Sequence, residues 1–200
     1  SVEAIEIEGG IEARLWVDDA QAEALGERRR AMLGPVGCGL CGIDSLSQAM
    51  RPLPEVPEGA RFDVAEISGA GDALRAHQPM HDLTRAVHAA GFLQSGRGIT
   101  HAREDVGRHN ALDKLIGALA REGVRAADGA FVMTSRVSVD IVQKAAMAGV
   151  GTIVSVSAPT AHALRLAEQT GITLAAFARG AQVEVFCHPH RITESTSDVA

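Results

Sequence analysis

Two cysteines, Cys38 and Cys41, stand in Cys-x-x-Cys spacing within the glycine-rich stretch "GPVGCGLCGIDSLSQAM" (34–50). Thiolates act as nucleophiles, redox partners and metal ligands, so this spacing indicates sulfur chemistry or metal binding. The glycines around the pair free the backbone, and residues 34–43 are predicted to form a flexible loop. Cys41 comes shortly before an expected helix start at Ser45, where the helix dipole favours a thiolate.

The residues alone leave several uses of this pair open. A structural zinc site needs four ligands. Cys38 and Cys41 supply two, and the others could come from Cys187, His188 and His190 if the fold brought them close. A zinc deaminase needs a His-x-Glu pair upstream, yet the first histidine of the chain is His77. A redox or sulfur-transfer thiol needs neither four metal ligands nor a His-x-Glu pair. The ordinary alternative is that the two cysteines lie in a surface loop and have no function. We therefore assign no metal ligand.

A second cluster lies in "HAREDVGRHNALDKLIG" (101–117), at a predicted strand-to-helix junction. Backbone N–H groups at the helix start, with Arg108 and Lys114, suit a phosphate or pyrophosphate, and His109 lies beside them. Glu104 and Asp105 have the right chemistry to accept hydrogen bonds from a guanine or pterin edge. The alternative is a solvated helix start with a surface charge network.

Further polar residues follow predicted strands. Arg136 lies in "TSRVS" and Arg179 in "FARGAQ" (177–182), each directly after a strand, whereas His88 lies in "TRAVHAA" (84–90). In an α/β sheet such positions line the ligand crevice. Taken singly, each arginine is an ordinary exposed turn residue and His88 an ordinary core histidine.

Hydrophobic periodicity predicts the elements that position these residues. Strands over 129–135, 152–157 and 172–180 alternate with helices over 108–123, 138–149 and 159–171. This alternation predicts an α/β fold with a mostly parallel central sheet. A strand over 11–19 precedes a helix over 20–33, which Asp18 or Asp19 can cap, and residues 51–62 form a Pro-rich linker. We expect residues 1–200 to form a single domain.

Composition narrows the class of protein. The chain has 200 residues, 46% of them hydrophobic, a net charge of −6 and 3% aromatic residues, which argues against a nucleic-acid-binding surface. No apolar run is long enough for a membrane helix, and the start of the chain does not resemble a signal peptide. Three cysteines without a secretory signal argue against a disulfide framework. We expect a cytoplasmic protein that binds neither nucleic acid nor membrane.

In chain order, "CGLCG", "REDVGRHNALDKLIG", "SRVSVDIVQKAAMAGV", "SVSAPTAHALRLAEQTGITLAAFARG" and "HPHRI" resemble the formate dehydrogenase accessory sulfurtransferase family, FdhD. The resemblance implies a cytidine deaminase-like three-layer sandwich and a homodimer. It also implies a sulfur carrier that accepts persulfide sulfur from a cysteine desulfurase. The sulfur passes to the bis(molybdopterin guanine dinucleotide) molybdenum cofactor before insertion into formate dehydrogenase. The rival reading is a non-catalytic chaperone that holds this cofactor.

The resemblance also implies roles for individual residues. Cys38 corresponds to the persulfide-bearing cysteine and Cys41 to its partner, which either releases the sulfur or tunes the pKa of Cys38. The expected cofactor-binding stretch consists of Phe177, Ala178, Arg179, Gly180, Ala181 and Gln182. Anchors for phosphate and guanine are expected from His88, Arg108, His109, Lys114 and Arg136. We expect GDP or GTP to bind as a surrogate for the cofactor.

The chain departs from the family pattern at three places. The family usually begins with a further segment of some tens of residues, which we expect this chain to lack. Where the family has Thr-Gly-Gly, this chain has Thr84, Arg85 and Ala86, so two side chains replace glycines near the expected pocket. Asp140 stands where the family tends to have Glu.

Overall fold

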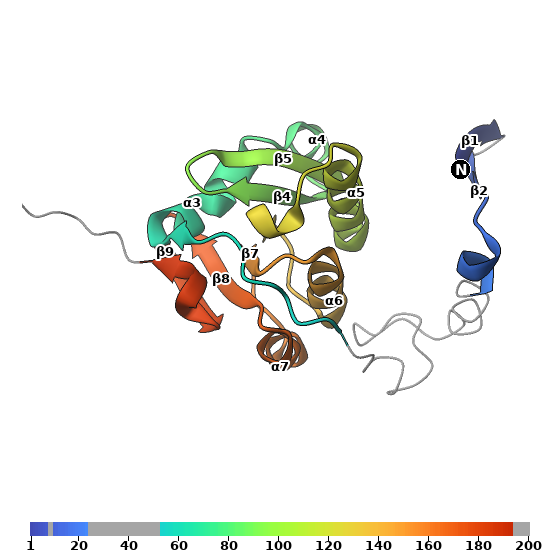
Figure 1. Ribbon diagram of the computed structural model, residues 1–200. Coiled ribbons are helices and arrows are strands. Elements are labelled where there is room, and N and C mark those ends of the chain that lie inside the picture. The colour runs from blue at the N-terminus through green and yellow to red at the C-terminus, as the bar shows by residue number, and fades with distance from the viewer. Residues whose placement is uncertain (8–9, 24–52, 194–200) are drawn as a thin grey trace, which may run out of the picture. The chain divides into compact units, whose positions relative to one another are not determined.

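The computed structural model describes residues 1–7, 10–23 and 53–193. The chain divides into two units, Ser1–Arg51 and Pro52–Ala200 (Figure 1). The segment with Cys38 and Cys41, and the short helix expected after Ser45, lie outside the described residues.

The first unit contains an antiparallel hairpin of β1 (Val2–Ile7) and β2 (Gly10–Leu15). Residues 19–23 are helical, and the Asp18 carboxylate accepts the Gln21 N–H at 2.8 Å, as a helix cap does. The strand and cap expected near the start of the chain are thus confirmed, although the strand ends at Leu15.

A six-stranded sheet in the order β5-β4-β6-β7-β8-β9 forms the centre of the second unit. Its strands are β4 (His88–Gln94), β5 (Gly98–Asp105), β6 (Ala130–Met133), β7 (Thr152–Ser155), β8 (Thr173–Arg179) and β9 (Gln182–Cys187). Only the β6–β7 and β7–β8 pairings are parallel, whereas β4–β5, β4–β6 and β8–β9 are antiparallel. The expectation of a mostly parallel sheet is therefore wrong, because the sheet is mixed.

Two tight hairpins explain two of the three antiparallel pairings, β4–β5 and β8–β9. β4 and β5 are joined through residues 95–97, and Gly96 and Gly98 both adopt a φ of 71° there. β8 and β9 are joined through Gly180, with a φ of 58°, and Ala181. Connections this short return the chain antiparallel, since a parallel crossover needs a dozen or more residues.

Helices cover both faces of the sheet. α3 (Val64–Arg75) packs on one face, and α5 (Arg108–Arg121), α6 (Val139–Ala148) and α7 (Ala161–Thr170) pack on the other (Figure 1). The three helices predicted in the second half of the chain are confirmed. The short helix α4 (Pro79–Thr84) buries no residue. None of the described helices combines the length and the apolar character needed to cross a bilayer.

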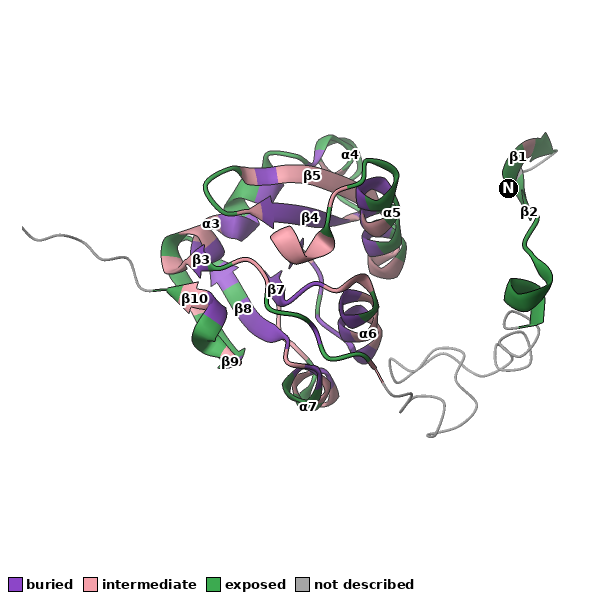
Figure 2. Cartoon of the chain, viewed as in Figure 1, coloured by how far each residue is buried: buried purple, intermediate pink, exposed green. Residues whose placement is uncertain are grey.

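The two faces of the sheet carry separate apolar cores. Phe92, Phe131 and Leu115 belong to the core under α5, α6 and α7, whereas Ile67 and Leu74 belong to the core under α3. The buried strands between these layers stand out in Figure 2. The arrangement is a three-layer α/β/α sandwich, and its likeness to cytidine deaminase stays a prediction.

A buried arginine joins several elements at the amino edge of the parallel strands. Residues 53–61, here called the strap, come from the Pro-rich stretch and lead into β3 (Phe62–Asp63), which pairs with β10 (Ile192–Thr193). The Arg191 guanidinium, whose residue is 3% exposed, donates to Gly171 O at 2.7 Å, Thr173 Oγ1 at 3.2 Å and Pro57 O at 3.4 Å. Arg191 therefore ties the strap to the end of α7 and the start of β8.

The left-handed backbone conformation of Arg85 predicts how replacing this residue changes the stability of the protein. Arg85 follows α4 with a φ of 56°, in the left-handed region. A side chain costs about 1–2 kcal/mol there, whereas glycine tolerates it but loses about 0.5–1 kcal/mol of chain entropy. We expect Arg85→Gly to raise the free energy of unfolding by up to about 1 kcal/mol in urea denaturation. Arg85→Ala removes the same charge without relieving the backbone, so an equal gain in both variants would contradict this explanation.

Candidate functional site

The carboxyl ends of β6, β7 and β8 lie at one edge of the sheet, because these strands are parallel. β4 runs antiparallel to β6, so it begins at this carboxyl edge with His88. Arg136 follows β6 there, and the stretch Phe177–Gln182 begins there at the end of β8. The prediction that polar residues gather at this edge holds for His88, Arg136 and this stretch.

Asp105 organises the start of α5. It lies opposite His88 in the β4–β5 ladder, and its Oδ1 accepts the Gly107 N–H at 2.8 Å. Its Oδ2 lies 2.6 Å from the Lys114 ammonium, which holds the pKa of Asp105 below its usual value. Lys114, expected to anchor phosphate, is thus already paired with a carboxylate.

The first turn of α5 carries positive charge without an anion. Its N-cap is Gly107, no side chain accepts from the free N–H groups, and the turn contains no acidic residue. Arg108 lies there, and its Nε is buried without a hydrogen-bond partner. Burial and the Arg108 charge lower the pKa of His88, which favours its neutral form. This combination of a helix N-terminus and an arginine suits an anionic ligand.

His109 links α5 to α6. Its Nε2 lies 3.4 Å from Ser138 Oγ and 3.6 Å from Asp140 Oδ2. Burial, followed by the Arg108 charge, lowers the pKa of His109, while Asp140 opposes this shift. Ser138 is the N-cap residue of α6, but its side chain makes no capping bond, and its hydroxyl lies 3.5 Å from Asp140 Oδ2.

Two exposed arginines at the carboxyl edge are unpaired. The guanidinium groups of Arg136 and Arg179 make no ion pair with any residue that the structure describes. β8 lies three strands from β4, which is about 14 Å across the sheet. The predicted residues therefore form two groups on one edge, one around His88 and Arg108 and the other in the β8–β9 turn.

The β8–β9 turn is distorted. Ala176 pairs with Glu184 and Arg179 with Gln182, so Phe177 and Ala178 together face a single residue of β9, which is a β-bulge. Phe177 has a φ of 54° and is 41% exposed, and its ring centroid lies 6.3 Å from that of Phe186. Bulges of this kind redirect side chains and are frequent beside functional sites.

Two acidic residues near this edge make backbone contacts that sequence reasoning did not predict, and one of them, Asp72, it missed altogether. Glu104, expected to meet a guanine or pterin, instead accepts the N–H groups of Met80 and His81 at 2.8 Å each and starts α4. Asp72 of α3 accepts the Gly180 N–H at 3.1 Å. Neither contact has a local sequence signal, because the partners lie far apart in the chain.

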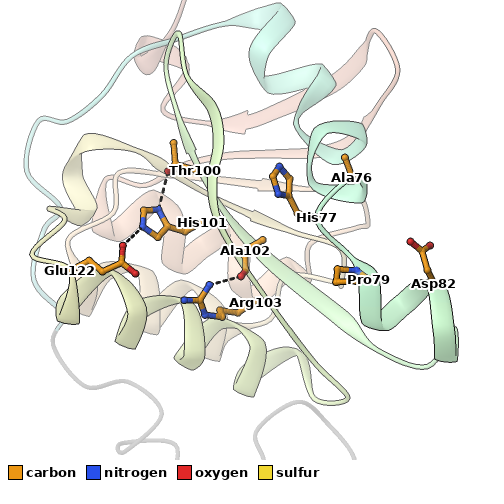
Figure 3. Close-up of a pocket in the computed structure, with 9 residues that line it drawn as sticks. All are labelled: Ala76, His77, Pro79, Asp82, Thr100, His101, Ala102, Arg103 and Glu122. Atoms are coloured by element: carbon orange, nitrogen blue, oxygen red, sulfur yellow. Dashed lines mark hydrogen bonds and ion pairs between the residues drawn. The ribbon is translucent and has the colours of Figure 1, made fainter.

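A separate groove of about 670 Å³ follows the outer edge of β5 (Figure 3). It is lined by Ala76, His77, Pro79, Asp82, Thr100, His101, Ala102, Arg103 and Glu122. None of the predicted site residues lines it. Side chains cover the strand edge here, since Arg103 donates to Ala102 O at 2.7 Å and Lys114 to Glu104 O at 3.1 Å.

The third cysteine is structural. Cys187 is 7% exposed, its thiol donates to Ile172 O at 3.3 Å, and burial raises its pKa. His188 Nε2 lies 2.9 Å from Glu168 O. Within the described ranges, no group of three His, Cys, Asp or Glu side chains could hold a metal ion.

Comparison with known proteins places this chain in one family. The model of the FdhD/NarQ family matches residues 1–193. Proteins named sulfur carrier protein FdhD from Bordetella bronchiseptica and Agrobacterium fabrum are each 45% identical to this chain. The matches cover 96% of this chain and 70% and 71% of those relatives.

A solved structure from Desulfotalea psychrophila, described as a candidate formate dehydrogenase accessory protein, shares the fold. Its TM-score is 0.65 at 23% identity, and the match covers 96% of this chain and 98% of that one. With the family model matching nearly the whole chain, the conclusion is that this chain belongs to the FdhD/NarQ family.

Proposed function

We propose that this protein carries sulfur during the maturation of formate dehydrogenase. The observation that carries the proposal is a Cys-x-x-Cys pair in a chain 45% identical to proteins named sulfur carriers. The cysteine desulfurase is the proposed sulfur donor, and the bis(molybdopterin guanine dinucleotide) cofactor is the proposed acceptor and bound substrate. The protein acts as a sulfurtransferase in this scheme and forms a homodimer.

The proposed chemistry at the cysteines is a pair of thiol exchanges. The Cys38 thiolate attacks the terminal sulfur of the donor's cysteine persulfide, the donor's S–S bond breaks, and its cysteine leaves as a thiolate. Cys38 now carries the persulfide. In the release step, the Cys41 thiolate attacks Cys38 Sγ, a Cys38–Cys41 disulfide forms, and sulfur leaves at the sulfide level. The two thiols supply the two electrons that this sulfur gains.

The carboxyl edge supports an extended, anionic substrate. Arg108 and the uncapped start of α5 form one cationic group, and Arg179 in the β8–β9 turn belongs to the other. Because the groups are about 14 Å apart across the sheet, a ligand that contacts both must be long. A dinucleotide with phosphates along its length has this shape and charge. GDP supplies one guanine nucleotide of that substrate and serves as its surrogate.

The role of Cys38 can be tested by sulfur loading. We expect incubation with a cysteine desulfurase and cysteine to add the mass of one sulfur atom to Cys38, detected by peptide mass spectrometry. Cys38→Ala should abolish the addition, whereas Cys187→Ala should load normally because the Cys187 thiol is buried. Full rescue of formate dehydrogenase by a protein with both Cys38 and Cys41 replaced by Ala would favour the cofactor chaperone instead.

The nucleotide site can be tested by calorimetry with GDP. If Arg179 contacts a phosphate, Arg179→Ala should weaken binding by about 1.5–3 kcal/mol, roughly ten- to a hundred-fold in Kd. Arg97→Ala is the matched control, because Arg97 lies in the β4–β5 turn at the opposite edge of the sheet. Equal losses in the two variants would mean that net charge, and not a specific contact, governs binding.

A further inference from the structure

We propose that Asp72 is a positioning residue for the nucleotide site, because its carboxylate fixes the β8–β9 turn that carries Arg179. This inference rests on the proposed function and adds a residue that neither the sequence pattern nor the chain's cysteines indicated. Asp72 lies on α3, on the opposite face of the sheet from α5, and it reaches the site only through the turn.

The contact itself is specific. Asp72 Oδ2 accepts the Gly180 N–H at 3.1 Å, across 108 positions of sequence. Gly180 has a φ of 58°, a conformation that few residues other than glycine adopt without strain. Arg179 precedes Gly180 directly and is the last residue of β8. A bond to the Gly180 amide therefore restrains the peptide unit that links Arg179 to the turn.

Close packing of α3 on β8 brings Asp72 within reach. A Cβ at Gly71 would lie 2.7 Å from Ala178 O and 2.8 Å from Val156 Cγ2, so only glycine allows this approach. Ala178 belongs to the same bulge as Phe177, whose left-handed φ of 54° is unfavourable for a side chain. Phe177 thus adopts a conformation that it does not favour by itself, and α3 supplies contacts that restrain the bulge and the turn.

Charge and hydrogen bonding at Asp72 act in opposite directions on an anionic ligand. The carboxylate repels a phosphate near Arg179, so the loss of charge alone would tighten GDP binding. The hydrogen bond orders the turn before the ligand arrives, so its loss would weaken binding. Asn at position 72 keeps an acceptor oxygen without the charge, whereas Ala keeps neither. The two variants therefore separate these effects.

The experiment is a double-mutant cycle in the full chain, read out as GDP affinity by calorimetry. We expect Asp72→Asn to bind GDP at least as tightly as the unmodified chain. Asp72→Ala should bind about two- to ten-fold more weakly than Asp72→Asn, the range for one neutral hydrogen bond. In an Arg179→Ala background the two variants should bind GDP alike, since the restraint acts through Arg179.

Each contrary outcome has a definite meaning. Equal affinity of Asp72→Asn and Asp72→Ala in the presence of Arg179 overturns the role of Asp72 and leaves the proposed function intact. A difference that persists after Arg179→Ala shows a general structural role and also overturns the inference. Failure of the unmodified chain to bind GDP removes the nucleotide site itself, and the positioning role with it. Hydrogen exchange at the Gly180 amide, faster in Asp72→Ala, checks that the contact is lost.

Discussion

The arrangement of the second unit depends on one buried cation. The Arg191 guanidinium has no carboxylate partner among its hydrogen bonds: its two terminal nitrogens donate to two carbonyls and a hydroxyl, and its Nε is buried without a hydrogen-bond partner among the described residues. Gly151 leaves room for it, because a Cβ there would lie 2.8 Å from Arg191 Nε. A buried charge that loses such partners is strongly destabilising. Arg191 consequently fixes where β8 begins, and the register of β8 determines where Arg179 emerges at the far edge.

The carboxyl edge then concentrates charge without neutralising it. Asp105 pairs with Lys114, and Asp140 lies close to His109; both partners belong to α5. Arg108, Arg136 and Arg179 remain without an ion pair to a described residue. Under the function proposed above, these unpaired cations are the groups that the phosphates of the ligand would meet. Charges that take part in ion pairs and charges that do not are thus divided along a single edge.

The sequence predicted the elements that local periodicity controls and missed those that depend on distant contacts. The helix that starts at Arg108 follows from residue spacing and is observed. The antiparallel strands of the sheet could not be predicted in the same way. β4 is a short apolar run, and its partner and direction are set by the turn that follows it. Lys114 looked like a phosphate anchor because its partner Asp105 stands nine positions earlier, beyond helical spacing. Asp72 carried no signal at all.

Lys114 makes two bonds, one within the candidate site and one at the exposed edge of the sheet. One of them covers Glu104 O, an outward-facing carbonyl of the edge strand β5, and Arg103 covers Ala102 O in the same way. Uncovered strand edges pair with other chains and lead to aggregation. Shortening Lys114 therefore does more than alter the charge beside Asp105, since it also exposes a template for intermolecular β-pairing. One side chain thus both neutralises Asp105 and covers the strand edge.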